Sequence, residues 1–98
     1  MTSRTPVFTS DIPEVPSGTV LTLRPVDWSH CAHVTPGTYL DVTVVRVHRT
    51  VTAVRSGALW VWIAGHQHPE CTWAHVERHA PCRHLMVRVD VLRRAVGQ

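Results

Sequence analysis

Lysine and asparagine are absent from this chain of 98 residues, and all ten of its basic residues are arginines. Phenylalanine and tyrosine occur once each, whereas arginine, alanine, valine and proline are plentiful. This usage is typical of a high-GC bacterial genome, in which arginine stands in for lysine. The formal net charge of +3 therefore permits nucleic-acid binding without implying it.

Long apolar runs are missing as well, and so are the common sequence motifs. The longest apolar run, 58–64, is far shorter than the ~20 residues that a membrane helix needs. Residues 1–10 lack the apolar centre of a signal peptide, so we expect a cytoplasmic protein with no membrane association. The chain has no CxxC, GxSxG or HExxH motif and no phosphate-cradling glycine loop.

Alternating hydrophobicity predicts the strands. Residues 19–24 predict a short first strand, and residues 38–54 predict a long one whose phase changes at two adjacent valines, which indicates a bulge or a bend. A tight loop at 55–57, with glycine where a positive φ is needed, leads into a strand at 58–64. Alternation over 84–92 predicts the last strand.

These strands predict a mostly β fold, a small single-domain barrel of the SH3-like or OB-like kind over residues 19–94. We expect Trp28 to plug one end of it. Residues 1–18, rich in Thr, Ser and Pro, predict an extended or disordered N-terminal arm, and residues 95–98 a frayed tail. The stretch 65–83 fits either a loop with an irregular strand or a helix, and a helix would favour the OB version.

Four pieces of the chain carry a resemblance: GTVLTLRPVDW (Gly18–Trp28), VTVVRV (Val42–Val47), WVWIAG (Trp60–Gly65) and VRVDVLRRA (Val87–Ala95). They resemble a group of short actinobacterial proteins with a small β-domain. The similarity covers residues 18–95 and rests on strand patterning. It implies a genomic setting that agrees with the composition, and it brings no known activity.

The strand at 58–64 is apolar on both sides. Its branched residues, Leu59, Val61 and Ile63, suit a barrel interior, which leaves Trp60 and Trp62 on the outer face. There they are either covered by the 66–83 segment or offered to a partner, because aromatic side chains on a sheet face can anchor a peptide or stack on bases.

Arginines on the outward side of the strands form the second candidate site. Arg46 and Arg88 could form a stripe that follows a phosphate backbone. Asp41 and Asp90 interrupt this stripe, so a solvated face without a ligand is the alternative.

Histidine and cysteine are concentrated in residues 66–84, which hold seven of them. One candidate zinc set is His66, His68, Cys82 and His84, and the alternative set is Cys71, His75, His79 and Cys82. The first set converges if the two segments pair antiparallel, and the second shares one face of a helix. Ordinary surface and core roles are the alternative, as is a disulfide within the segment. The odd cysteine count favours reduced thiols or metal ligands over a disulfide framework.

Three functions follow from these features. The first is a non-catalytic interaction module that binds a protein partner or a second copy of the chain. The second is a zinc-stabilised small barrel that binds nucleic acid. The third is a small enzyme that uses Cys31 as a nucleophile, with His30 or His33 as its base.

Overall fold

The computed structural model describes residues 12–32, 34–67 and 81–97. Its elements, in chain order, are β1 (Val20–Leu23), the 3₁₀ turn η2 (Pro25–Asp27), β2 (Trp28–Ser29), β3 (Leu40–Arg55), β4 (Ala58–Gln67), β5 (Arg83–Arg88) and α1 (Val89–Ala95). The choice between loop and helix after β4 falls on residues 68–80, which lie outside the described residues. Neither described helix is long and apolar enough to cross a membrane.

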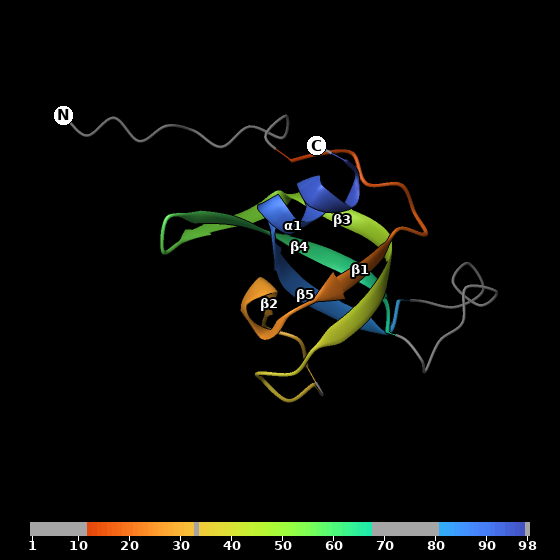
Figure 1. Cartoon of the computed structure of the whole chain (residues 1–98). Coiled ribbons are helices and arrows are strands. Elements are labelled where there is room, and N and C mark those ends of the chain that lie inside the picture. The colour runs from red at the N-terminus through yellow and green to blue at the C-terminus, as the bar shows by residue number, and fades with distance from the viewer. Residues whose placement is uncertain (1–11, 33, 68–80, 98) are drawn as a thin grey trace.

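The five strands form one antiparallel sheet in the order β1-β3-β4-β5-β2. Its two edge strands, β1 and β2, follow each other in the chain and are joined by η2, so the sheet curls until its edges nearly meet (Figure 1). The prediction of a mostly β, small barrel-like domain is confirmed. β4 lies at the centre of the sheet, as a strand that is apolar on both sides should.

Strand β3 changes register twice. The pairing passes from Val44 with Gly65 to Arg46 with Ala64, so Val45 is the extra residue of the bulge that the sequence predicts. A second irregularity, over residues 49–51, follows His48 and has no sequence signal. The first half of β3 pairs with β1 and β4, whereas its second half pairs with β4 alone and projects from the barrel as a hairpin (Figure 1).

Two glycines permit this geometry. At the tip of the hairpin, Ser56 and Gly57 both have positive φ, 51° and 77°, as a type I′ turn requires. Gly65 lies where β3 and β4 approach closely. A Cβ there would overlap the carbonyl oxygen of Thr43 and lie 2.8 Å from a methyl carbon of Val42.

The predicted last strand, 84–92, is too long. β5 ends at Arg88, opposite Trp60, and the chain then forms α1. Val89 and Leu92, three residues apart, share one face of this helix and are both buried. The helix lies over the barrel end beside β1 (Figure 1). Alternating valines fit this short buried helix as well as a strand, so periodicity did not separate the two. The predicted tail, 95–98, begins inside α1, and Gly97 follows the helix with φ 81°.

The described part of the predicted arm, 12–18, packs on the barrel. Ile12 is buried in the core of the barrel, so the described end of the predicted extended arm contributes to that core. Arg49, from the second irregularity of β3, donates to the Ile12 carbonyl at 2.7 Å and pairs with Glu14 at 2.9 Å. The irregularity therefore directs an arginine back onto the arm.

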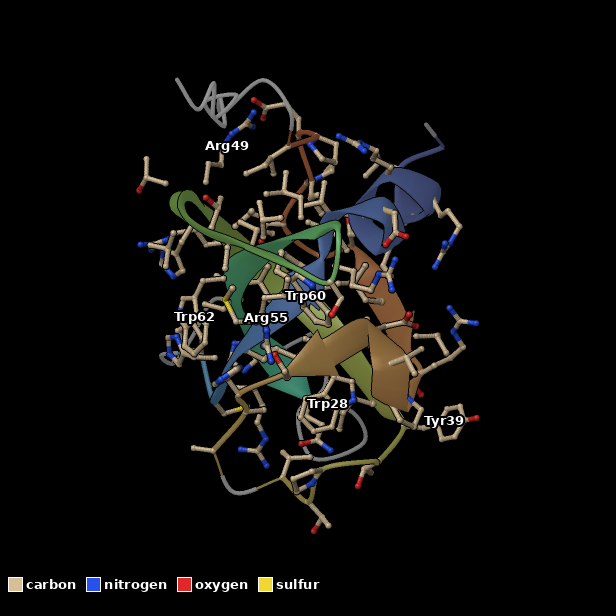
Figure 2. All side chains as sticks on the ribbon, turned by 90° about the vertical axis from the view of Figure 1, so that its left-hand side faces the viewer. Trp28, Tyr39, Arg49, Arg55, Trp60 and Trp62 are labelled. Carbon is tan, nitrogen blue, oxygen red and sulfur yellow. The ribbon has the colours of Figure 1, made fainter. Side chains whose placement is uncertain are left out.

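The core is enclosed by the sheet and closed at its two ends. α1 covers one end, and Trp28 closes the opposite end, as predicted from its place between strands (Figure 2). The indole N–H of Trp28 donates to the Thr38 carbonyl at 2.7 Å, which satisfies its polar atom inside an apolar setting.

Candidate binding face

The two tryptophans of β4 lie on the outer face of the barrel, as the alternation predicts. Trp60 stands opposite Ala53 of β3 and Arg88 of β5, and Trp62 stands opposite His48 and Met86. Opposite residues of an antiparallel pair share a face of the sheet, so the tryptophans point the same way as these four neighbours. The residues between them, Val61 and Ile63, point inward and are fully buried.

Both tryptophans are half-buried on this face. Trp60 lies under the base of the hairpin, and Trp62 lies farther along the same strand (Figure 2). The indole nitrogen of Trp60 is shielded from solvent and has no acceptor among the described residues. A buried donor without an acceptor costs about 1–3 kcal/mol. A phenylalanine at this position would avoid that cost.

Arg55, at the end of β3, covers Trp60. Its guanidinium carbon lies 5.7 Å from the centre of the indole ring, within the range of a cation–π contact (Figure 2). The Nη1 atom of Arg55 donates to Ser29 Oγ at 3.2 Å and lies 3.5 Å from His30 Nδ1. Arg55 thus bridges the hairpin and β2. Alternation alone does not reveal the contact between Arg55 and Trp60, because it places Arg55 in the loop. The hairpin register, which places Arg55 diagonally opposite Trp60, is the signal that could have revealed this contact.

The two arginines predicted to bind lie on the same face. Arg46 is exposed and stands opposite Ala64, one pleat along β4 from Trp62. Arg88 stands opposite Trp60, and its Nη2 and Nε atoms pair with the Asp90 carboxylate at 3.1 and 3.2 Å. Asp90 thus offsets one of the two arginines, and this is one of the two interruptions of the stripe that the sequence predicts.

We call this surface the Trp/Arg face, which consists of Arg46, His48, Arg55, Trp60, Trp62 and Arg88. Three adjacent strands, β3, β4 and β5, supply its residues. Its permanent charges are all positive, and Asp90 is the carboxylate that the described residues place against them. Asp41, the other predicted interruption, stands opposite Thr22 of β1 and belongs to a different part of the sheet.

The predicted metal ligands separate into those that meet and those that do not. Cys82 Sγ lies 3.6 Å from His66 Nδ1, and the ring of His66 is fully buried. His84 is exposed opposite Ala64, and no third His, Cys, Asp or Glu of the described residues joins the pair in a group that could hold a metal. The remaining predicted ligands lie outside the described residues: His68, Cys71, His75 and His79.

The thiol of Cys31 does not have the setting of a nucleophile. Burial raises its pKa, against an opposing effect of the nearby Arg83 charge, and a thiol with a raised pKa holds little thiolate at neutral pH. The His30 ring contacts Ser29 Oγ at 2.8 Å and forms no hydrogen bond with Cys31. The predicted alternative base, His33, lies outside the described residues.

A surface cleft of about 490 Å³ borders Cys31 at the end of the barrel that Trp28 closes. Its lining is Pro25, Trp28, Ser29, His30, Cys31, Ala32, Val34, Pro36 and Gly37. The chemistry that these residues offer is apolar contact, a hydroxyl and an imidazole.

Comparison with protein families, curated proteins and solved structures finds no match to this chain. The resemblance to short actinobacterial β-domain proteins stays a prediction.

Proposed function

We propose that this protein is a non-catalytic interaction module whose Trp/Arg face binds a protein partner through an acidic, amphipathic segment. The observation that carries the proposal is the pair of half-buried tryptophans at the centre of the sheet, on its outer face, beside arginines. Tryptophan and arginine are the residues most enriched where protein interfaces concentrate their binding energy.

The energetics of the tryptophans support an interface. Fully burying an apolar side chain contributes about 1.5–3 kcal/mol, and an indole that remains partly exposed leaves part of that gain unused. A partner that covers Trp60 and Trp62 would recover it.

The charge of the face indicates the chemistry of the partner. Arg46 is exposed, and Arg55 is held in place by Trp60, Ser29 and His30. A glutamate or aspartate can pair with either guanidinium without disturbing the Arg55–Trp60 stack. A second copy of the chain would bring arginines against arginines, so we propose a different, acidic protein.

Single-stranded nucleic acid is the second candidate, because the same arginines could follow a phosphate backbone and Trp62 could stack on a base. The position of Arg55 favours a protein partner over single-stranded nucleic acid. A base that stacks on Trp60 from the side of Arg55 would have to displace the Arg55 guanidinium. We propose a cytoplasmic setting, which is supported by the free thiols of Cys31 and Cys82.

A titration followed by tryptophan fluorescence separates these candidates. The probes are an amphipathic peptide of Glu and Leu, its counterpart with Lys in place of Glu, and an oligo-dT. We expect the Glu peptide to bind, and we expect both Trp62→Ala and Arg46→Glu to weaken its binding at least about tenfold, a loss of ~1.4 kcal/mol. Arg94→Glu is the matched control, because it makes the same charge change on α1.

Three results would decide against the protein proposal. Equal binding of the Glu and Lys peptides would show that the face does not select acidic partners. Preferential binding of oligo-dT, lost on raising the salt concentration, would establish the nucleic-acid candidate. Equal effects of Arg46→Glu and Arg94→Glu would show that net charge, and not the Trp/Arg face, governs binding.

A further inference from the structure

The hairpin of β3 and β4 has one edge that no described strand covers. β1 pairs with residues 40–43 of β3, and the backbone contacts of Gly18 and Thr19 with Val44 are the last on that side. Beyond Val44, β3 pairs with β4 alone among the described residues, as far as the turn at the tip (Figure 1). An edge strand presents unpaired N–H and C=O groups, which are a template for a further strand.

The hairpin register shows which backbone groups point to this edge. In a hairpin with a two-residue turn, the residues that flank the turn exchange hydrogen bonds, and here these are Arg55 and Ala58. Hydrogen-bonded and non-hydrogen-bonded pairs alternate along an antiparallel ladder. The N–H and C=O groups of Thr52 and Val54 therefore point away from β4, toward the free edge.

This edge is apolar and regular. Natural edge strands are commonly protected from pairing by charged side chains, by proline or by bulges. Residues 50–54 include no charged residue and no proline, and from Thr52 to the turn the ladder with β4 has no irregularity. Val51 and Val54 are 50% and 63% exposed, so the edge offers apolar side chains as well as backbone groups.

The two arginines that flank this stretch are held by contacts within the domain. Arg49 pairs with Glu14 of the arm at 2.9 Å, and the guanidinium carbon of Arg55 lies 5.7 Å from the centre of the Trp60 ring. A strand that pairs with the edge would leave both contacts in place, because it adds hydrogen bonds to the backbone between them.

The charge of the hairpin indicates the chemistry of an added strand. Residues 42–67 contain three arginines and no Asp or Glu. Neighbouring strands lie about 4.8 Å apart, so one face of an added strand would lie beside Ala53 and Arg55, on the outer side, and the other face beside Val54. Carboxylates on the first face and apolar side chains on the second match these neighbours.

We propose that the acidic, amphipathic segment of the partner binds as an extended strand that pairs with the edge of β3 at Thr52 and Val54. Because the segment is that of the same partner, strand addition depends on the proposed function, and it adds the conformation: acidic and apolar residues alternate one by one, as they do not on a helix. Ala53 lies between this edge and Trp60, so the outer side chains of the strand adjoin the Trp/Arg face.

Amide hydrogen exchange tests this proposal on the full chain, measured by NMR with and without a peptide of alternating Glu and Val. In the free chain, the amides of Thr52 and Val54 should exchange faster than those of Ala53 and Arg55, which point to β4. We expect the peptide to slow exchange at Thr52 and Val54 at least about tenfold and to change exchange at Ala53 and Arg55 less.

A proline at the edge supplies a second measurement. Val54→Pro removes the outward N–H and keeps the hydrogen bonds to β4, since proline is tolerated where the N–H of an edge strand faces solvent. We expect it to weaken peptide binding, followed by tryptophan fluorescence, at least about tenfold. Val54→Thr keeps the N–H and should restore binding relative to Val54→Pro. Circular dichroism verifies that both variants are folded.

Three results would overturn strand addition and leave the proposed function standing. In the first, an acidic peptide binds and Trp62→Ala weakens its binding, but the amides of Thr52 and Val54 exchange as fast as before. In the second, the peptide slows all four amides equally, which is a general stabilisation of the hairpin. In the third, the helix-forming peptide of Glu and Leu binds and the alternating peptide does not.

Two further results have a different meaning. If raising the concentration of the chain alone slows exchange at Thr52 and Val54, a second copy occupies the edge, and the assignment to an acidic partner is wrong. If neither acidic peptide binds the folded wild type, strand addition and the proposed function fail together.

Discussion

Over residues 60–63, the two faces of β4 differ in burial although their residues alternate one by one, whereas Ala64 and His66, farther along the outer face, are buried. Val61 and Ile63, on the inner face, are fully buried, whereas Trp60 and Trp62, on the outer face, are half-buried. Hydropathy alone does not separate the two faces, since both are apolar. A nearly closed barrel has one interior, and branched aliphatic side chains fill it. Apolar residues on the opposite face then need an explanation, and the proposed partner would supply one.

The inner face should respond most strongly to truncation. Ile63→Ala removes a fully buried side chain from the centre of the sheet, and we expect a loss of about 4 kcal/mol in the free energy of unfolding. Urea unfolding at equilibrium measures this loss from the shift in midpoint at an unchanged slope. A loss below about 1 kcal/mol would mean that Ile63 is not part of a tightly packed interior.

A substitution at Gly65, where β3 and β4 approach closely, tests the packing of β4 by adding atoms to it instead of removing them. Gly65→Ala places a methyl group against the Thr43 carbonyl and Val42, and we expect a loss of about 2–3 kcal/mol. Alanine normally improves a strand or a helix relative to glycine. A variant as stable as the wild type would therefore show that the strands are farther apart than described.

Closure of the barrel, which defines the inner face, depends on the turn between β1 and β2. Asp27 is buried and accepts hydrogen bonds from Arg24 Nε, Nη2 and the Arg24 backbone, at 3.1, 3.1 and 2.9 Å. Burial acts to raise the pKa of Asp27, but the hydrogen bonds and charge of Arg24 outweigh it and hold the pKa below its usual range. We expect Asp27→Asn to cost about 1–2 kcal/mol at neutral pH, a modest figure because the Arg24 side chain is exposed.

The pH dependence of this contribution has a definite sign. Since the folded-state pKa of Asp27 is lowered, its stabilisation is present above the unfolded-state pKa of about 4 and is lost as the pH falls through the folded-state value. Unfolding measured between neutral and acid pH should show a smaller loss for Asp27→Asn than for the wild type. Parallel curves would contradict the assigned ion pair.

The smallest effect is expected on the outer face, at Trp60. Trp60→Phe keeps most of the aromatic area and removes the buried N–H that has no acceptor among the described residues. We expect the free energy of unfolding to stay within about 1 kcal/mol of the wild type, because relief of the unpaired donor offsets the lost contact area. A loss above about 2 kcal/mol would show that the N–H has a partner within the folded chain.

Hydrophobic alternation predicted the long strand, its bulge at Val45, the hairpin and the orientation of both β4 faces. Each of these depends on local backbone geometry and on the side to which a residue points. The change from strand to helix at Val89 was missed, because it depends on the packing of α1 against β1 and β4, which is a tertiary contact.

Contacts between segments distant in sequence were also beyond prediction. The hydrogen bond from Arg49 to the Ile12 carbonyl comes from an irregularity of β3 without a sequence signature. The Arg55–Trp60 stack depends on the hairpin register. The contact between His66 and Cys82 was the exception, because antiparallel pairing of their two segments was enough to predict that they meet.

Trp62→Ala, compared with Ile63→Ala in the same urea experiment, tests the central claim that one strand supplies a core and a binding face. The two residues are neighbours on β4, and tryptophan is the larger. Our account predicts that Trp62→Ala lowers the free energy of unfolding by less than about 1.5 kcal/mol, because the side chain is half-buried, whereas Ile63→Ala lowers it by about 4 kcal/mol. A loss of about 3 kcal/mol or more for Trp62→Ala, the cost of truncating a core tryptophan, would contradict the account and assign Trp62 to internal packing.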